Sequence, residues 1–250
     1  MSGHNRWTKI KHKKEAQGAA KGKLFTKLIK EITVSTRMGG GDPDGNARLR
    51  SAISAAREAN MPADNITRAI KKGTGELEGI NYEEATYEGY GPSGVALIVQ
   101  CLTDNRNRTA GEVRHLFTKG GGNMAESGAV GWMFERRGTI EVKPGPTEDQ
   151  VMEVALEAGA LDVVAQDEGF EVRTEPNDLH KVVQALEARK LTLGELKIAY
   201  LPKETLRLEK LEDAQKVLKM VDLLEDNEDV QSVFANFEVD DKIIDQIAGS

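Results

Sequence analysis

The sequence is poor in several residue types, and each shortage excludes a class of protein. Its 250 residues include 1 cysteine, Cys101, which lies in an apolar run typical of a strand, so an internal disulfide is impossible and a reducing compartment is expected. Aromatic residues make up 5% of the chain, and no run approaches the roughly 20 uncharged apolar residues that a membrane span needs. The N-terminus also lacks the apolar core of a secretion signal. We therefore expect a cytoplasmic protein that does not enter a membrane.

The chain also lacks the usual signatures of catalysis and metal binding. One cysteine cannot supply spaced pairs of zinc ligands, and no H-E-x-x-H, G-x-S-x-G or G-x-x-x-x-G-K-[ST] motif occurs. Gly89, Gly91 and Gly94 fit G-x-G-x-x-G, but a strand pattern follows them and Pro92 removes an N–H that a phosphate-binding loop needs. The histidines are scattered: His4, His12, His115 and His180. We expect a protein that is not an enzyme, with no cofactor, no metal and no small-molecule substrate.

What the chain has in plenty is charge, and the two signs are separated along it. Through Lys72 there are 16 lysines and arginines against 6 acids, a net charge of +10, whereas the remainder carries −17 and the whole chain −7. Nine of the basic residues lie in the first 30 positions, with Trp7 and Phe25 between them. The positive electrostatic field of these residues attracts a polyanion, and the flat rings of Trp7 and Phe25 can stack on nucleic-acid bases. Nucleic acid is therefore the first expected partner, an anionic membrane surface is the rival, and a merely solvated lysine face is the alternative without function.

The expected nucleic-acid contacts lie in the N-terminal arm, in the helix that follows it and in the second helix. They are Arg6, Trp7, Lys9, Lys11, His12, Lys13, Lys14, Lys21, Lys23, Lys27, Arg48 and Arg50. The arm has no apolar periodicity, so its lysines are expected to be mobile until they meet phosphates. Trp7 has a second interpretation as a hydrophobic anchor onto the first domain.

Three amphipathic helices are predicted in the first 78 residues. The first has its apolar stripe at Leu24, Phe25, Leu28, Ile29 and Ile32, which leaves Lys23, Lys27 and Lys30 on the outer side, and it ends at Gly39–Gly41. The second begins near residues 44–46, buries Leu49, Ala52, Ile53 and Ala56, and keeps Arg48, Arg50 and Arg57 outside. The third opens at Pro62, buries Ile66, Ala69 and Ile70, and ends at a left-handed Gly73.

After Gly75 the apolar period becomes that of strands. A hairpin is expected from 82–90 and 95–102, followed by a helix over 107–118 and a strand through Val130, Trp132 and Phe134. Residues 138–202 predict a β-α-β-β-α-β unit, entered and left through turns at 136–138 and 201–203. A helix over 211–224 and a strand over 230–239 follow, and 240–250 is expected to fray.

These elements predict an α+β protein with a discontinuous middle domain. The N-terminal domain, 1–78, is basic and helical with a flexible arm; 79–137 plus 203–240 form a small α/β domain; and 138–202 form an acidic, ferredoxin-like α/β domain inserted into it, leaving 241–250 as a tail. The one polar cluster outside the first domain, Asp104–Thr109, is interpreted as a helix N-terminus capped by Asn and Thr rather than as a contact surface.

Several segments together resemble one known family along nearly the whole chain. They are GHNRWTKIKHKK, KLFTKLIKEI, GGGDPDGNARLRSAI, NMPADNITRAIKKGTG, YEGYGPSGVALIVQCLTDNRNRT and GGNMAESGAVGWMF, and they are similar to the YebC family. The chain departs from the usual pattern at Asn5-Arg6, where Ser-Lys is common, and at Thr8, where a small residue is common. The resemblance implies three domains in this arrangement. It also implies either a transcription regulator that binds DNA or a ribosome-associated translation factor that binds structured RNA and assists synthesis of proline-rich stretches.

The residues alone favour neither of these two functions. Lysine contacts to phosphates carry no base information, whereas the lack of an evident helix-turn-helix spacing favours recognition of RNA by shape. The family's usual description favours DNA and transcription regulation. The expected partner is therefore nucleic acid, either DNA or ribosomal RNA, with the ribosome as a second candidate.

Overall fold

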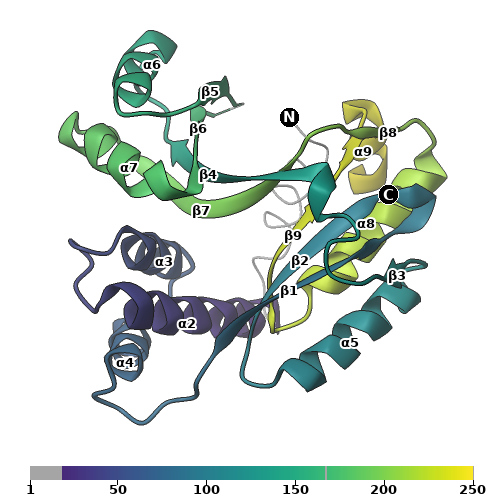
Figure 1. Cartoon of the computed structure of the whole chain (residues 1–250), viewed down its shortest axis with the longest axis horizontal. Coiled ribbons are helices and arrows are strands. Elements are labelled where there is room, and N and C mark those ends of the chain that lie inside the picture. The colour runs from purple at the N-terminus through teal and green to yellow at the C-terminus, as the bar shows by residue number, and fades with distance from the viewer. Residues whose placement is uncertain (1–18, 167, 250) are drawn as a thin grey trace. The chain divides into compact units, whose positions relative to one another are not determined.

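The computed structural model describes residues 19–166 and 168–249 (Figure 1) and confirms the mixed α+β fold class. The chain forms two compact units: unit 1 comprises Met1–Lys30, Ile80–Glu135 and Leu201–Ser250, and unit 2 comprises Glu31–Gly79 and Arg136–Tyr200. Helix α2 (Ala19–Gly39) therefore begins in unit 1 and ends in unit 2. The division into three domains stays a prediction. No helix among the described residues is long and apolar enough to span a membrane.

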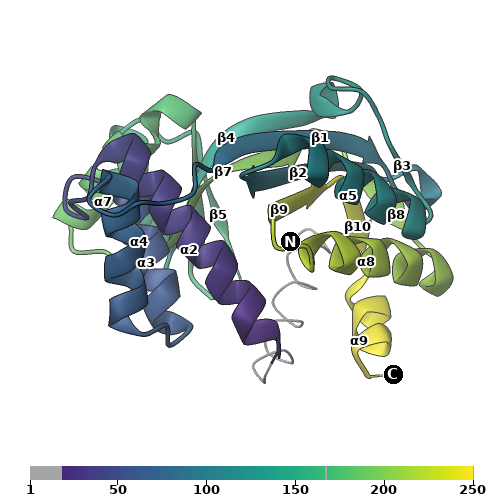
Figure 2. The same ribbon diagram turned by 90° about the horizontal axis from the view of Figure 1, so that it is seen from below.

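Unit 1 contains a four-stranded sheet in the order β3-β1-β2-β9, with β3 at Asn123–Met124 and β9 at Val230–Ala235. Strands β1 (Glu83–Tyr90) and β2 (Ala96–Thr103) form the predicted hairpin, paired from Glu83 with Thr103 to Tyr90 with Ala96. Helices α5 (Arg106–Lys119) and α8 (Leu211–Glu225) lie side by side (Figure 2) and pack their apolar faces onto the sheet. The largest fully buried side chains of this core are Phe117, Leu97, Leu218, Met220, Leu224 and Phe237.

Two sequence expectations at the C-terminal end of unit 1 are wrong. The strand expected over 230–239 is interrupted at Asn236, whose side-chain oxygen accepts a hydrogen bond from the Ala96 N–H at 2.8 Å. The chain continues as β10 (Phe237–Val239), which pairs in parallel with β8 (Leu206–Leu208). Residues expected to fray form helix α9 (Asp241–Gly249), because Ile244 is fully buried in the core and holds the helix there.

The strand expected through Trp132 is also absent. Residues Gly131–Met133 form a 3-10 turn, and strand β4 (Phe134–Val142) begins only after it. A 3-10 turn does not alternate its side chains, so Val130 is buried while Trp132 is 69% exposed. The Trp132 indole Nε1 donates to the Ala129 carbonyl oxygen at 3.1 Å.

In unit 2 the second half of α2 packs with α3 (Ala47–Glu58) and α4 (Ala63–Thr74). The buried faces of α3 and α4 are close to those predicted, and Asn46 caps α3 by accepting a hydrogen bond from the Leu49 N–H at 3.0 Å. The left-handed residue after α4 is Gly75, with φ +84°, and not Gly73 as the sequence suggested. Gly73 lies inside the helix, where a Cβ would come within 2.5 Å of the Thr36 Cβ, so its role is to let α4 approach α2.

The sheet of unit 2 has the order β5-β6-β4-β7, the ferredoxin-like order that the β-α-β-β-α-β pattern predicted. Its strands β5 (Asp162–Ala165), β6 (Phe170–Thr174) and β7 (Leu193–Pro202) and its helices α6 (Glu148–Glu157) and α7 (Leu179–Ala188) follow β4 in the predicted order of strands and helices. Both expected boundary turns are wrong, since β4 continues through 136–138 and β7 continues to Pro202. Arginine and glycine at 136–138 suggested a turn. These positions instead belong to the same strand as the buried, alternating residues Ile140 and Val142.

Candidate nucleic-acid interface

Seven of the predicted contact residues lie outside the described part of the chain. They are Arg6, Trp7, Lys9, Lys11, His12, Lys13 and Lys14. The structure places the other five: Lys21, Lys23, Lys27, Arg48 and Arg50.

Two of these five are exposed on the first turns of α2. Lys21 and Lys23 are both exposed, and neither makes an ion pair within the described residues. The Lys21 Nζ lies 5.7 Å from the centre of the Phe25 ring, one helical turn along, so the aromatic face keeps the ammonium close to the helix surface. These two cations are positioned to meet a polyanion that approaches this end of α2.

The next two lysines of α2 do not lie free on the outer side as the helical pattern predicted. Lys27 Nζ donates to the Glu225 carbonyl oxygen. Lys30 is 6% exposed, donates to the Asp229 carboxylate and, at 3.1 Å, to the Glu228 carbonyl, and lies 5.6 Å from the Tyr82 ring centre. The segment 225–229, which precedes β9, thus binds both cations within unit 1. Lys30 needs this partner because a buried charge is costly unless it is paired with an opposite charge.

Asp229 is the centre of this buried ion network. Besides Lys30, its carboxylate accepts hydrogen bonds from the Thr109 hydroxyl at 2.6 Å and from Arg108 Nη2 at 2.9 Å. Burial alone raises the pKa of Asp229, but the hydrogen bonds from Lys30, Thr109 and Arg108 outweigh it and lower the pKa below its usual range. The carboxylate therefore stays ionised and joins α2, α5 and the turn before β9.

The cavity beside this network does not suit a phosphate. It has a volume of about 600 Å³, and its lining includes the acids Asp104, Glu112, Asp226, Glu228 and Asp229 against the cations Lys30 and Arg108. The cations on its wall, Lys30 and Arg108, are already paired with Asp229. A phosphate entering here would meet net negative charge, so this cavity is unsuited to nucleic acid.

The Asp104–Thr109 turn has the structural role that its sequence indicated. The Asn105 side chain caps α5 by accepting a hydrogen bond from the Arg108 N–H at 3.1 Å. Thr103 assists from the preceding strand, where its hydroxyl accepts from the Asn105 N–H at 2.9 Å. The side chains of Asn105 and Thr103 therefore already form hydrogen bonds with the backbone at the start of α5, which supports a capping role rather than a ligand-binding one.

Arg48 and Arg50, the predicted contacts on α3, are half-buried in ion pairs of unit 2. Arg48 Nε lies 2.6 Å from Glu31 Oε1, and Arg50 Nη2 lies 2.8 Å from Glu187 Oε1. The guanidinium of Arg50 also donates to the Pro43 carbonyl at 2.8 Å. Both arginines thus support the packing of α3, and a phosphate would have to compete with a carboxylate for each.

Sequence reasoning missed a basic face on the neighbouring helix. Arg68 and Lys71 of α4 are exposed and Lys72 is half-exposed, and they follow one another at i, i+3 and i+4, which places them on one side of the helix. Arg57, in the last turn of α3, is exposed as well. None of the four makes an ion pair within the described residues. Their helical spacing was the signal that could have identified them.

The described residues hold no group of three or more histidine, cysteine, aspartate or glutamate side chains placed to bind a metal. Cys101 is buried in β2, and burial is the main cause that raises the pKa of its thiol to about 12. That thiol is protonated at neutral pH and packs in the core, which confirms the sequence interpretation.

Comparison with known proteins identifies the family. The TACO1/YebC protein N-terminal domain matches residues 5–76, and the TACO1/YebC second and third domain matches residues 82–237. A protein from Myxococcus xanthus named "probable transcriptional regulatory protein" is 58% identical over 99% of both chains, and one of the same name from Persephonella marina is 52% identical over 99% of this chain and all of its own. The crystal structure of a conserved hypothetical protein from Aquifex aeolicus has a TM-score of 0.79 and 50% identity, covering 89% of this chain and 92% of its own. The chain therefore belongs to the TACO1/YebC family.

Proposed function

We propose that this chain is a non-enzymatic regulator of gene expression that binds nucleic acid through its basic N-terminal region. The observation that carries the proposal is the set of exposed cations without ion pairs in the described residues, found on α2, α3 and α4: Lys21, Lys23, Arg57, Arg68 and Lys71. The lysines of the arm extend this set along the sequence. Phosphate backbones bind such groups and release counterions.

The charge of the rest of the chain orients this contact. Residues after Lys72 carry a net −17, so the body of the protein repels the polyanion that the N-terminal region attracts. The buried acid Asp229 already has cationic partners, so it offers no free negative charge that would weaken the positive N-terminal end of the sequence.

Relatives named probable transcriptional regulatory proteins make duplex DNA the first candidate target. The lack of an evident helix-turn-helix spacing in the sequence favours structured RNA as the second. Figure 1 shows α3 and α4 on either side of α2. Exposed cations on these helices supply phosphate contacts without an evident base-reading helix, which suits an RNA recognised by its shape, as in a ribosome-associated translation factor.

A competition titration distinguishes the two targets. A transcription regulator prefers one genomic duplex over random duplex by about 10³ or more at physiological salt. A ribosome-associated factor binds both duplexes weakly and equally and sediments with ribosomes. Weak, equal binding to duplex DNA, ribosomal RNA and ribosomes alike would contradict nucleic-acid binding as the function.

The cations themselves are tested by the salt dependence of binding. In the variant Arg68→Gln, Lys71→Gln, Lys72→Gln, the slope of log affinity against log salt should fall by up to about 2 to 3 units, at roughly 0.7 to 0.9 for each phosphate that the variant no longer neutralises. The arm variant Lys9→Ala, Lys11→Ala, Lys13→Ala, Lys14→Ala should lower the slope by up to about 3 to 4 units by the same relation.

The matched control removes three charges from another helix of unit 2. The variant Lys181→Gln, Arg189→Gln, Lys190→Gln changes exposed residues of α7 and its C-terminal turn and has the same net charge as the α4 variant. Its slope should stay near that of the unaltered chain. Equal slopes for the α4 variant and the α7 control would exclude α4 from the interface.

A further inference from the structure

The outer face of helix α6 in the ferredoxin-like part of unit 2 has exposed apolar side chains. Met152 is 37% exposed and Leu156 is 45% exposed. The two are four residues apart, so they form one stripe along the helix. The opposite side, Val151, Val154 and Ala155, is buried in the core. Met152 and Leu156 therefore leave part of their apolar surface in contact with solvent.

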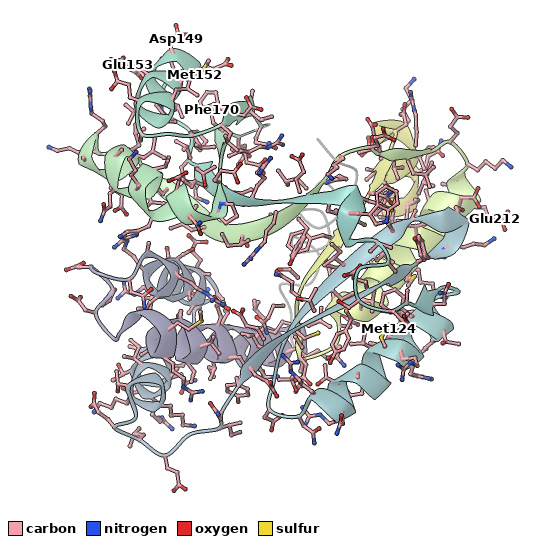
Figure 3. All side chains as sticks on the ribbon, viewed as in Figure 1. Met124, Asp149, Met152, Glu153, Phe170 and Glu212 are labelled. Carbon is pink, nitrogen blue, oxygen red and sulfur yellow. The ribbon has the colours of Figure 1, made fainter. Side chains whose placement is uncertain are left out.

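Acids lie beside this stripe. Glu148, Asp149, Glu153 and Glu157 are all exposed, and none makes an ion pair within the described residues. Figure 3 shows Met152 together with Asp149 and Glu153 on the side of α6 that points away from the sheet. The face thus combines an apolar stripe with uncompensated negative charge.

Several acids elsewhere in residues 138–202 form ion pairs, unlike those of α6. Residues 138–202 contain 13 acids and 6 basic residues, and on the sheet each of several acids has a basic neighbour. Glu141 lies 3.3 Å from Lys143, Glu171 lies 2.8 Å from Arg173, and Glu195 lies 2.6 Å from Lys197. Helix α6, by contrast, holds four acids and no basic residue.

The stability of α6 does not account for all four acids. Glu148 and Asp149 lie in the first turn, where they complement the helix dipole. Thr147 and Gln150 form a capping box that already satisfies the helix start. Glu157 lies in the last turn, where negative charge is unfavourable, and Glu153 has no basic partner one turn away.

We propose that the outer face of α6 is a docking surface for a basic polypeptide segment of another protein, with apolar side chains that cover Met152 and Leu156. The charge on the face selects this occupant. Nucleic acid and anionic lipid are repelled by the four acids, and a second copy that presented the same face would bring like charges together. Lysines or arginines flanking two or three leucine-sized side chains would pair with the acids and bury the stripe.

The test uses the full chain and a defined probe. The probe is a fluorescein-labelled peptide of about 15 residues, made of leucine and lysine with the leucines on one helical side, and binding is followed by fluorescence anisotropy at physiological salt without nucleic acid. Two comparison peptides replace the leucines by serine or the lysines by glutamate. The leucine–lysine peptide should bind more tightly than either one, by about tenfold or more.

Substitutions then locate the binding site. Met152→Ser with Leu156→Ser should weaken binding of the peptide by about tenfold or more, with a melting temperature close to that of the matched control below, because the side chains in the two variants are exposed to a similar extent. Asp149→Asn with Glu153→Gln should weaken it and reduce its dependence on salt. The matched control is Leu206→Ser with Leu211→Ser, which are 37% and 40% exposed in unit 1 and should leave the affinity unchanged.

Several outcomes would overturn the proposal. One is an affinity that the Met152 and Leu156 substitutions leave unchanged, and another is an equal loss in the Leu206 and Leu211 control. Sedimentation velocity that showed self-association abolished by Met152→Ser with Leu156→Ser would assign the face to a second copy instead. Binding to neutral phosphatidylcholine vesicles that the same substitutions abolish would assign it to lipid.

Discussion

At the scale of single residues, buried and half-buried carboxylates in unit 1 serve as structural anchors. Glu88 on β1 accepts hydrogen bonds from the backbone N–H groups of Gly128, Val130 and Gly131, each at 2.8 Å. This one side chain fixes the loop that leads into β4, as Asp229 binds Lys30 in the middle of α2. Burial alone raises the pKa of Glu88, but the three N–H donors outweigh it, and the pKa lies below its ordinary value.

The substitution Glu88→Gln should therefore destabilise the protein in a pH-dependent way. Since the folded-state pKa is lower than the unfolded one, the stabilisation is complete above the usual glutamate range, near about 4.3, and is lost as the pH falls through the folded-state value. At pH 7 we expect a loss of about 1 to 2 kcal/mol from the weakened N–H contacts, and a smaller loss at pH 4. Urea unfolding at both pH values measures the difference.

Glu126→Gln is the matched control, because Glu126 is an exposed carboxylate in the same loop. Its free energy of unfolding should equal that of the unaltered chain at both pH values. A Glu88→Gln loss that is the same at pH 4 as at pH 7 would mean that the ionised carboxylate is not what holds the loop.

At the scale of elements, glycines decide where two helices can touch. Gly73 of α4 approaches α2 so closely that a Cβ would lie 2.7 Å from the Thr33 carbonyl oxygen as well as 2.5 Å from Thr36. Gly111 of α5, by contrast, has nothing within 4 Å of its would-be Cβ. Both glycines lie inside helices, and only the first is required by packing.

The pair Gly73→Ala and Gly111→Ala should consequently change stability in opposite directions. Gly73→Ala should destabilise by about 1 to 3 kcal/mol, because backbone and a β-branched side chain must move to admit the methyl group. Gly111→Ala should stabilise by about 0.5 to 1 kcal/mol, since alanine loses less backbone entropy in a helix. Thermal unfolding of both variants measures this. A Gly73→Ala protein as stable as Gly111→Ala would contradict the close packing of α4 on α2.

At the scale of the whole molecule, the core of unit 1 is assembled from two segments distant in sequence. The buried residues of this core lie between Ala85 and Phe117 and between Leu208 and Ile244. The chain leaves and re-enters unit 1 within β4 and β7, at residues 135–136 and 200–201. The insertion therefore contributes no side chain to that core.

Replacing residues 136–200 with a short Gly-Ser linker should leave a core that unfolds cooperatively. Leu218→Ala, which removes a fully buried side chain of α8, should cost about 2 to 5 kcal/mol in both the full chain and the deletion. Chemical unfolding of the four proteins provides the comparison. Noncooperative unfolding of the deletion, or a much smaller cost of Leu218→Ala within it, would show that the core depends on the inserted segment.

The apolar periodicities in the sequence were enough to predict most of the helices and strands. The buried face of α3, the β1–β2 hairpin and helix α6 follow directly from spacings of about 3.6 and 2 residues, because those spacings decide which side chains can share a face. The family was also determined by the sequence alone, since the motifs GHNRWTKIKHKK and GGNMAESGAVGWMF are carried by local residues.

Tertiary structure decided which charges are free. Along α2 the spacing placed Lys30 outside, yet Asp229, 199 residues away in sequence, pairs with it and buries it. Arg50 is likewise paired by Glu187 of the distant helix α7. The cations of α4, by contrast, meet no acidic partner within the described residues. A helical period specifies the direction of a side chain, but an ion pair depends on which distant segment the fold brings to it.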